Sequence, residues 1–367
     1  MLKPTYIMVG GFLGAGKTTA ILRVAELLRA RSRRIGLITN DQSTGLVDTS
    51  LLASHGFPVQ EIAGGCFCCK FNSLVEAADR LTEDAKPDVF IAEPVGSCTD
   101  LRSTVSYPMQ RLYGDNFQIA PLSVLADPIR AQRILGLRSG NRFSPKVIYI
   151  YEKQLEEADL VVINKSDLVN AAEIDELKGA VNARWPHVRV LAMSTRTGNG
   201  LEDWLAAITS ERLVDSPAMD IDYDLYADGE ALLGWLNLSA TLTGPEFDGN
   251  SLLRDIADRL QDDLRGQVVD IGHLKMTLVP DEGPDIAVIN LVHRDASAEM
   301  SHALTDSLTE GQLLLNLRAE GEPEQLQRDV AAALSAACAA VDVELRVQDV
   351  SAFRPSRPMP VHRLARV

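Results

Sequence analysis

Short apolar segments alternate with amphipathic ones over the first part of the chain and predict strands that alternate with helices. Runs of strand length, one of them with its turn, occupy residues 6–9, 35–41, 88–92, 160–163 and 188–193. The stretch 20–29 has the spacing of an amphipathic helix. Apolar strands connected by helices are typical of a parallel sheet that is covered on both faces. We therefore expect residues 1–212 to form an α/β domain of the P-loop NTPase type with a mostly parallel sheet.

The pattern changes beyond residue 212. Residues 213–229 are acidic and contain a proline, which predicts a linker. Beyond it, strands are expected at residues 232–241, 273–279, 286–293, 313–318 and 341–347, and helices at 252–264 and 324–340. This order predicts a smaller ferredoxin-like α+β domain over residues 230–350. The proline-rich tail, residues 351–367, is expected to be extended and either to wrap the domain or to engage a partner.

Composition and charge narrow the classes of function. The 367 residues are 46% hydrophobic and 24% charged, an ordinary globular composition, and they exceed the length that one core usually supports. The net charge of −15 disfavours general nucleic-acid binding, because the protein repels phosphate backbones. No apolar run approaches the roughly 20 residues of a membrane helix, and the first residues lack the pattern of a secretory signal. We expect a cytoplasmic protein that binds neither nucleic acid nor membranes.

A phosphate-binding loop directly follows the first predicted strand. Residues 11–18 match the pattern Gly-x-x-x-x-Gly-Lys-Ser/Thr, with a strand before them and a helix after them. Glycines let backbone N–H groups surround a phosphate, and the helix N-terminus adds partial positive charge. Lys17 is expected to neutralise phosphate oxygens, and Thr18 to offer its hydroxyl to Mg²⁺. The predicted nucleotide-binding residues of this loop are Gly14, Ala15, Gly16, Lys17, Thr18 and Thr19.

A second motif predicts which base is bound. The tetrapeptide Asn-Lys-Ser-Asp at 164–167 follows a predicted strand. Its aspartate can accept hydrogen bonds from N1–H and the 2-amino group of guanine, a donor pair that adenine lacks, while the asparagine and lysine brace the loop and cover the ring. The loop at 194–201 resembles the one whose backbone meets the guanine O6 in many GTPases. GTP and GDP are therefore the expected ligands, and the predicted guanine-site residues are Asn164, Lys165, Asp167, Ser194 and Thr195.

The third predicted strand ends at Glu93, which places a carboxylate beside the P-loop. Glu93 is expected to hold a water of Mg²⁺ or the attacking water, and Gly96 to present its N–H to the γ-phosphate. The polar loop that contains Asp48 is expected to sense the γ-phosphate by ordering and disordering on hydrolysis. The predicted catalytic residues are thus Lys17, Glu93 and Gly96. The predicted magnesium ligands, direct or through water, are Thr18, Glu93 and Asp48.

Three of the five cysteines, Cys66, Cys68 and Cys69, are crowded into four residues behind two glycines. Thiolates bind zinc, copper(I) and other soft metals, and a reducing cytosol disfavours disulfides. Residues 73–76 fit a capping box, so a helix is expected to start just after Phe71, and its positive end would favour thiolates. Vicinal cysteines cannot easily join the third around one ion in ideal tetrahedral geometry, so we expect two or three sulfurs and one ligand from elsewhere.

Cys98, just beyond Glu93, is the candidate for that other ligand. The alternative for Cys98 is a small buried residue that packs as a hydrophobe, and Cys338, in an alanine-rich helix, is expected to be buried in this way. For the three clustered thiols the alternative is a redox-sensing pair.

The four motifs, in this order, resemble those of the CobW family of P-loop GTPases, relatives of the nickel-insertion GTPases of urease and hydrogenase maturation. The resemblance rests on residues 11–19, 64–69, 93–96 and 164–167. The cysteine motif is the most specific of them, because ordinary GTPases lack it. One departure is Asn-Asp-Gln-Ser at 40–43, where typical members carry Asn-Glu-Phe-Gly and the urease-type relatives are closer to this chain. A histidine-rich loop is also missing from the sequence.

The resemblance implies GTP-driven metal handling. It assigns Lys17 and Thr18 to phosphate and Mg²⁺, Glu93 to hydrolysis, Asn164 and Asp167 to guanine, and the clustered cysteines to a transition metal, with Zn²⁺ or Co²⁺ expected. The predicted function is a metallochaperone that delivers this metal, or a metal cofactor such as a corrinoid, to a client metalloprotein or corrinoid protein. The second domain would recognise that client or pack a homodimer.

Two other classes of function remain alternatives. One is a GTP-regulated metal or redox sensor that transfers nothing. The other is a nucleotide kinase, which the guanine motif and the lack of an acceptor-site lid pattern disfavour.

Overall fold

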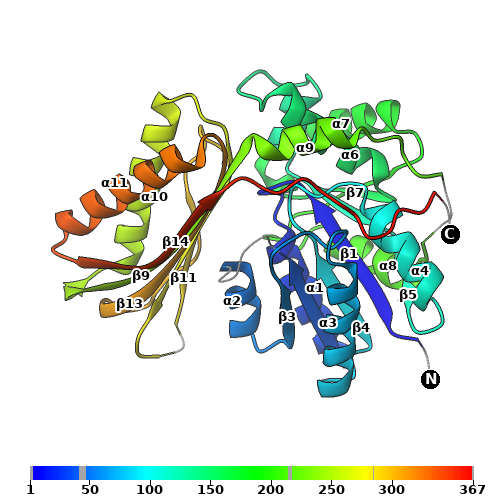
Figure 1. The fold of residues 1–367 in the computed structure, drawn as a ribbon, viewed down its shortest axis with the longest axis horizontal. Helices are drawn as coiled ribbons and strands as arrows, with labels where there is room; N and C mark the ends of the chain where they lie inside the picture. Colours follow the sequence, from blue (N-terminus) through cyan, green and yellow to red (C-terminus); the bar gives the residue numbers. More distant parts are fainter. Residues whose placement is uncertain (1–2, 41–46, 214–216, 284, 366–367) are drawn as a thin grey trace. The chain divides into compact units, whose positions relative to one another are not determined.

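The computed structural model describes residues 3–40, 47–213, 217–283 and 285–365. They divide into two compact units (Figure 1). The first comprises residues 1–44, 55–229 and 357–367, and the second comprises residues 45–54 and 230–356. The chain therefore leaves the first unit twice, once for a short excursion and once for a whole domain, and its last residues return to the first unit.

The first unit is built on a parallel sheet. Its strands are β1 (Thr5–Gly11), β2 (Ile35–Asn40), β3 (Val59–Ile62), β4 (Val89–Glu93), β5 (Gln118–Ile119), β6 (Ser123–Ala126), β7 (Leu160–Ile163) and β8 (Arg189–Ala192). Their order is β3-β2-β4-β1-β6-β7-β8, with β5 paired beside β1. All of these pairings are parallel. The predicted P-loop type of α/β sheet is confirmed.

Helices lie on both faces of this sheet (Figure 1). They are α1 (Lys17–Ala30), α3 (Phe71–Asp84), α4 (Tyr107–Tyr113), α5 (Pro128–Ile134), α6 (Pro145–Glu157), α7 (Ala171–Arg184), α8 (Leu201–Ser210) and most of α9 (Tyr223–Ala231), with a π-helical turn, η1 (Arg102–Ser106), and a 3₁₀ turn, η2 (Ser166–Leu168). Every residue of β1, β2, β4, β6 and β7 is buried, which explains their continuous apolar runs. The carboxyl ends of these strands meet at one edge of the sheet, where ligands of such folds bind.

Two helices begin earlier than the sequence pattern predicts. Helix α1 starts at Lys17 because Gly16, in the left-handed conformation, is its N-cap, so the P-loop leads straight into the helix. Helix α3 starts at Phe71 with Lys70 at its N-cap and no side-chain cap hydrogen bond. The predicted capping box at residues 73–76 is therefore wrong. The carbonyl of Cys66 already accepts hydrogen bonds from the N–H groups of Cys69 and Lys70, and this turn continues into the helix.

The second unit is an antiparallel sheet with two long helices. Its elements are β9 (Leu233–Phe247), α10 (Gly249–Gly266), β10 (Ile271–Pro280), β11 (Ala287–Leu291), β12 (Glu299–His302), β13 (Leu308–Glu320), α11 (Pro323–Ala340) and β14 (Glu344–Phe353), together with α2 (Val47–Ser54). The strand order is β12-β11-β10-β13-β9-β14. Strands β14-β9-β13-β10 with helices α10 and α11 have the order of a ferredoxin-like fold. Strands β11 and β12 extend one edge, and β12 was not predicted from the sequence.

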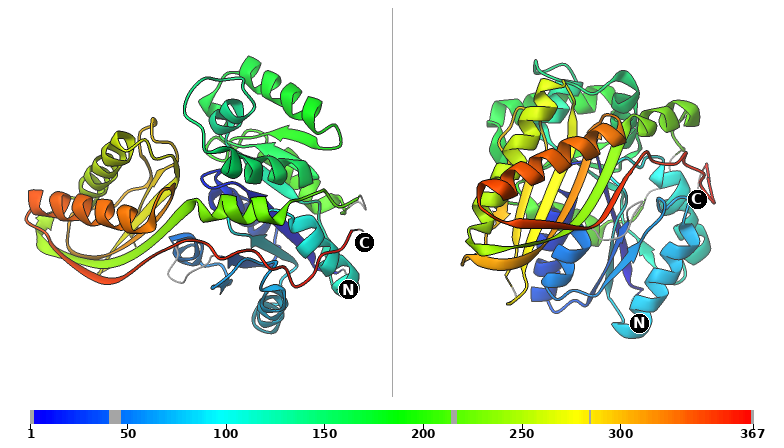
Figure 2. Two further views of the ribbon diagram at one scale, coloured as in Figure 1. Left: turned by 45° about the horizontal axis from the view of Figure 1, so that its top comes forward. Right: turned by 60° about the vertical axis from the view of Figure 1, so that its left-hand side comes forward.

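The two faces of this second sheet differ in polarity. Along β9, Leu236 and Leu238 alternate with Trp235 and Asn237. The leucines join the apolar core that lies under α10 and α11, which share one side of the sheet (Figure 2). On the other face, Asn237 accepts hydrogen bonds from two buried side chains of β13: the Asn316 amide at 2.9 Å and the Arg318 guanidinium at 2.8 Å.

Helix α2 replaces part of the predicted polar loop. It contacts β10 and β13, and the Val47 N–H donates to Asn316 Oδ1 at 3.2 Å. Helix α2 lies in the crossover between β2 and β3 of the first unit, yet its packing partners belong to the second. Sequence periodicity misses such a helix because its eight residues are too few to define a face.

Two further segments differ from simple linkers. The acidic stretch predicted as a linker runs into α9, and before that helix the Asp220 carbonyl accepts from Lys153 Nζ while the Asp222 N–H donates to the Tyr149 hydroxyl. The proline-rich tail is partly strand, because β14 continues to Phe353. Among the described residues, none of the helices combines the length and the apolar character that crossing a membrane requires.

Candidate functional site

The P-loop is held in shape by two glycines that tolerate no side chain. Gly11 has φ +129°, and a Cβ there would lie 2.3 Å from the Leu125 carbonyl oxygen. Gly16 has φ +85°, and a Cβ there would lie 2.6 Å from Asn164 Nδ2. Both positions combine a left-handed backbone with a close approach, so only glycine fits. The loop therefore packs against β6 and against the end of β7.

Lys17, Thr18 and Glu93 meet at the carboxyl end of β1 and β4. The Thr18 hydroxyl donates to Glu93 Oε1 at 3.1 Å, and Lys17 Nζ lies 3.9 Å from the same oxygen. All three side chains are buried. A cation, a hydroxyl and a carboxylate beside the N-terminus of α1 form a set suited to a Mg²⁺–phosphate group, because Mg²⁺ takes hard oxygen ligands and the helix end attracts anions. The structure thus brings these three predicted residues together.

Gly96 lies directly against the P-loop. A Cβ on Gly96 would be 2.7 Å from Leu13 Cδ2 and 3.2 Å from the Leu13 backbone nitrogen. The loop after β4 is held by Gln154, whose amide donates to the carbonyls of Gly96 and Cys98 at 3.0 and 2.8 Å. Gln154 is a buried residue of α6 that sequence reasoning did not identify, because nothing in the chain marks it as the partner of a loop about sixty residues away.

Asn164 connects the guanine motif to the P-loop. Its amide donates to the Ala15 carbonyl at 3.0 Å, and its Oδ1 accepts from the N–H and hydroxyl of Thr195 at 3.3 and 3.1 Å. Asn164 is fully buried. It therefore acts as a brace between three loops, with its amide and its carbonyl oxygen both used inside the protein.

Lys165 and Asp167 lie on either side of this brace. Lys165 Nζ donates to the Gly14 carbonyl at 2.8 Å and to Asp127 Oδ2 at 3.0 Å. Asp127, the N-cap of α5, was missed by sequence reasoning, although an Asp-Pro pair is a recognisable helix start. Asp167 lies in η2, where Arg196 approaches its carboxylate to 3.5 Å. Ser194 forms a turn in which its hydroxyl accepts from the Thr197 N–H.

The three clustered thiols converge between β3 and α3. Cys66 Sγ lies 2.8 Å from Cys68 Sγ and 3.0 Å from Cys69 Sγ, and the latter two sulfurs are 3.7 Å apart. Among the described residues, these three form the one cluster of cysteine, histidine or acidic groups that could hold a metal ion. A tetrahedral zinc site with Zn–S bonds of about 2.3 Å spaces its sulfurs about 3.8 Å apart. The vicinal pair already has that spacing, so an ion requires Cys66 to move away from both.

The thiols do not titrate alike. Hydrogen bonding with Cys68, Cys69 and Cys98, in that order of effect, holds the pKa of Cys66 well below its usual range. The interaction with Cys66 in turn raises the pKa of Cys68 well above its usual range and is the main cause that raises the pKa of Cys69 to about 11. Cys66 is therefore the first of the three thiols to lose its proton as the pH rises. Cys66 and Cys68 are buried, and Cys69 is half-buried and forms the accessible side of the cluster.

Asn40 joins the end of β2 to the thiol loop. Its buried amide donates to the Ile62 carbonyl at 2.9 Å and to the Gly65 carbonyl at 2.7 Å. Asn40 thus links the end of β2 to the residue before Cys66 through a single side chain. The predicted switch residues 41–43 lie outside the described part of the chain. Asp48 is placed in α2, but its side chain lies outside the described part as well.

Cys98 and Cys338 are both buried, but only Cys98 lies beside the cluster. Cys338 packs into the apolar core of the second unit. The C-terminal segment also reaches the thiol loop, and Arg363 of that segment donates to Asp100; no sequence motif marks either contact.

Comparisons with known proteins match the nucleotide-binding part of the chain. A family model described as CobW/HypB/UreG, nucleotide-binding domain, matches residues 5–191. The chain is 28% identical over 196 residues to the zinc chaperone CobW of Sinorhizobium sp, an alignment that covers 48% of this chain and 55% of that protein. It is 29% identical over 168 residues to the zinc chaperone YeiR of Escherichia coli, covering 44% and 46%. It is 27% identical over 201 residues to the hydrogenase maturation factor HypB of Azotobacter vinelandii, covering 54% and 58%. The chain thus spans about half the length of the curated relatives it matches.

Solved structures are similar at lower identity. HypB from Helicobacter pylori in complex with nickel is 19% identical, with a TM-score of 0.41 and coverage of 57% of this chain and 92% of that chain. Zn(II)-bound YjiA GTPase from E. coli is 15% identical, with a TM-score of 0.32 and coverage of 92% and 99%. Since the family model spans more than half of the chain, the protein belongs to the CobW/HypB/UreG family of nucleotide-binding proteins.

Proposed function

We propose that this protein is a GTP-hydrolysing metallochaperone, which couples its nucleotide state to the binding and delivery of a transition metal. The observation that carries the proposal is the pairing of two sites in one unit. A P-loop braced by the Asn164 loop provides for guanine nucleotide, and three converging thiols provide for a soft metal. The Asn40 amide, at the end of β2, donates to the Gly65 carbonyl and so connects this strand to the thiol loop. The curated relatives named zinc chaperones support zinc as the first metal to test.

In the nucleotide site, Mg²⁺ would be held by the Thr18 hydroxyl and, directly or through water, by Glu93; Asp48 remains a further candidate. Bound there, the ion supplies positive charge at the β- and γ-phosphates. Lys17 would neutralise the same oxygens, and the Gly96 N–H would meet the γ-phosphate, a role that the close approach of Gly96 to Leu13 of the P-loop supports. Glu93 would orient the attacking water. Asp167 would recognise the guanine edge, with Ser194 and Thr195 shaping the loop around it.

In the thiol site, Cys66, Cys68 and Cys69 are the proposed metal ligands, and Cys98 the proposed fourth. A set of four sulfurs favours Zn²⁺ over the harder cations that oxygen ligands select, and Co²⁺ fits the same tetrahedral set. The hydrogen bonding between Cys98 and Cys66 supports including this fourth thiol. The cargo would go to a client metalloprotein, or to a corrinoid protein if the cargo is a metal cofactor. A cytoplasmic location and a homodimer are further parts of the proposal.

Metal stoichiometry tests the thiol half of this function. Purified protein should bind about one Zn²⁺ or Co²⁺ per chain, because the three sulfurs converge on one point. The triple variant Cys66→Ala, Cys68→Ala, Cys69→Ala should bind none at this site. A matched control is Cys338→Ala, which removes a thiol from the core of the other unit and should leave the stoichiometry unchanged. An unchanged metal content in the triple variant would refute the assignment.

Nucleotide coupling tests the chaperone half. Metal affinity should differ between the GTP-analogue and GDP forms by a coupling free energy of about 1–3 kcal/mol. Release to a metal-free client should require hydrolysable GTP. Equal affinity in the two nucleotide states would contradict a chaperone, and release with a non-hydrolysable analogue alone would favour the alternative of a sensor.

A further inference from the structure

The C-terminal segment, residues 357–365, lies along the thiol site as an extended strap. It follows the second unit in sequence but packs within the first (Figure 2). Its backbone bonds to three separate elements: the Val361 N–H donates to the Cys68 carbonyl, the Leu364 N–H donates to the Ser103 carbonyl, and the Ala365 carbonyl accepts from the Ala218 N–H, each at 2.9 Å. We refer to residues 357–365 as the strap.

One strap residue contacts the thiol cluster itself. The backbone N–H of Met359 donates to Cys69 Sγ at 3.1 Å. Cys69 is the most accessible of the three sulfurs, so the strap covers the side from which an ion or another protein would approach. An N–H group aimed at a thiolate stabilises its negative charge, and outer hydrogen bonds of this kind tune the affinity of metal ligands. The Met359 side chain points to solvent, which leaves the backbone as the contacting group.

The strap is anchored on both sides of this contact. Three residues after Met359, the His362 ring meets Phe71, the first residue of α3, edge to face with centroids 4.9 Å apart. Next to it, Arg363 Nε donates to Asp100 Oδ2 at 2.7 Å, and the Tyr223 hydroxyl donates to the same oxygen at 2.7 Å. Pro358 is buried beside Met359. These neighbouring contacts hold Met359 next to Cys69, so the strap does not depend on the Met359 hydrogen bond alone for its position.

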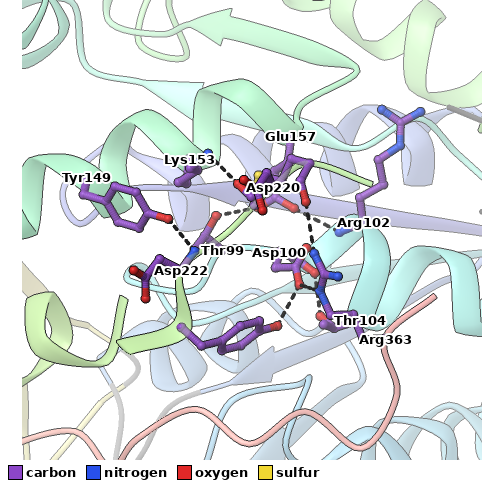
Figure 3. Close-up of polar contacts among 12 residues, drawn as sticks. Thr99, Asp100, Arg102, Thr104, Tyr149, Lys153, Glu157, Asp220, Asp222 and Arg363 are labelled. Carbon is purple, nitrogen blue, oxygen red and sulfur yellow. Dashed lines mark hydrogen bonds and ion pairs between the residues drawn. The ribbon is translucent and has the colours of Figure 1, made fainter. Parts of the chain in front are cut away.

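The anchor residue Asp100 belongs to the loop that leaves the nucleotide site. It lies seven residues after Glu93 and two after Cys98, and its side chain is almost completely buried. Its φ is +62°, an unusual value for a residue other than glycine, which the surrounding contacts must enforce. Figure 3 shows the Arg363 guanidinium reaching Asp100 within this cluster of polar groups. A shift of the loop that carries Glu93 and Gly96 would move the residue on which the strap is fastened.

We propose that the strap is a latch on the thiol site: the Met359 N–H completes the surroundings of the Cys69 sulfur, and the Arg363–Asp100 contact lets the loop after Glu93 control when the strap opens. This inference rests on the proposed function, since it names the regulation of the same metal site. Closed, the strap slows the exchange of the ion. Opened by a change in the nucleotide site, it exposes Cys69 to the receiving ligands of a client.

Met359→Pro tests the latch at a single hydrogen bond. Proline removes the N–H donor, and the segment is already extended and flanked by Pro358 and Pro360, so the backbone shape is compatible. In the full-length protein, release of Zn²⁺ to a chromogenic chelator should become about 10- to 100-fold faster, the size expected for losing an outer hydrogen bond to a metal ligand. The matched control Met359→Ala keeps the N–H and loses only an exposed side chain, so its release rate should equal that of the natural protein.

Arg363→Gln tests the anchor and its dependence on nucleotide. Release should again be faster, and the difference in release rate between the GTP-analogue and GDP forms should disappear. Arg357→Gln is the control. Arg357 belongs to the same strap, but its exposed ion pair is with Asp224, so the substitution leaves the contact with Asp100 in place. Wild-type release rates in both Met359→Pro and Arg363→Gln would overturn the latch. Faster release with an intact nucleotide dependence in Arg363→Gln would overturn the link through Asp100.

A readout without metal separates this inference from the proposed function. In metal-free protein, alkylation of Cys69 should be about tenfold faster in Arg363→Gln than in Arg357→Gln, because losing the anchor to Asp100 lets the strap leave the sulfur. If the protein bound no metal at all, the proposed function would fail, while the alkylation rates would still decide whether the strap covers Cys69. Equal alkylation rates in the two variants would overturn the cover itself.

Discussion

The nucleotide site and the thiol site belong to the same unit, yet they are built by opposite means. The P-loop is fixed by buried contacts that tolerate no substitution, such as Gly16 against Asn164. The thiol loop is open around Gly64, where a Cβ would meet nothing within 4 Å, and it is covered by a strap from the far end of the chain. One site is rigid before its ligand arrives, and the other has parts that must move.

This difference suggests how the two sites divide the work. A preorganised loop suits the electrostatic demands of phosphate chemistry, where donors must be in place before the transition state forms. A thiol site that hands over its ion needs sulfurs that can change their spacing and a cover that can leave. The sulfur of Cys66 lies closer to the other two sulfurs than a bound ion allows, so the spacing of the sulfurs must change when an ion binds. The extended strap is the cover that can leave.

The largest expected effect separates the sites completely. Lys17→Ala removes the cation that lies beside Glu93, and GTP hydrolysis should fall by about 10²- to 10³-fold, the usual cost of losing one preorganised charge partner. Steady-state phosphate release measures the effect. Because Lys17 is not one of the proposed metal ligands, Zn²⁺ stoichiometry should stay at the natural value. A variant that loses metal as well as hydrolysis would show that the two sites are not distinct.

The second prediction uses proton release. The pKa of Cys68 is raised and that of Cys69 is raised to about 11, so both thiols must lose protons when an ion binds at neutral pH, whereas the lowered pKa of Cys66 makes it the first of the three to ionise. Metal affinity should therefore rise with pH, by about a hundredfold per unit for two released protons. Competition titrations at several pH values measure the slope. GTP affinity over the same range is the internal control and should change little; a metal affinity that is flat with pH would contradict the titration order.

The matched pair Gly16→Ala and Gly64→Ala tests rigidity against openness. Both glycines have positive φ, +85° and +79°, so both variants incur the backbone cost of about 1–2 kcal/mol. Gly16→Ala adds a clash with Asn164 Nδ2, which should bring its total to about 2–3 kcal/mol in the free energy of unfolding and abolish GTP binding. Urea unfolding and nucleotide titration measure the two effects. Equal losses in both variants would refute the contrast between the sites.

The same contrast explains what the sequence could and could not predict. The parallel sheet, the P-loop and the brace at Asn164 follow from local motifs, because residues that bind phosphate and guanine must stand at fixed spacing behind strands. The thiols were also found, since three cysteines in four residues are rare. Gln154, Asp100 and Met359 were not found: each acts across 50 residues or more of sequence through a backbone group or a single carboxylate. Contacts of that kind leave no periodic trace in the chain.

Helix boundaries failed for a related reason. Residues 73–76 match the sequence of a capping box, but the turn at the Cys66 carbonyl leads into α3, which begins at Phe71, before those residues. Helix α2 was predicted as a polar loop because its packing partners, β10 and β13 of the same unit, lie more than 200 residues away in the sequence. In both cases a tertiary contact outweighed local propensity.

The smallest expected effect concerns the connection between the sites. Asn40→Ala removes the amide that joins the end of β2 to the carbonyls of Ile62 and Gly65, and leaves GTP-binding residues and thiols in place. If this side chain carries part of the coupling, the ratio of metal affinities in the GTP-analogue and GDP forms should shrink by about fivefold, which corresponds to about 1 kcal/mol. Ser123→Ala is the control, because it removes a buried hydrogen bond of similar size, donated by Trp204 to this residue at the start of β6, and should leave that ratio unchanged. An unchanged ratio in Asn40→Ala would transfer the coupling to the one other route between the sites described above, the loop from Glu93 to Asp100 and the strap fastened to it.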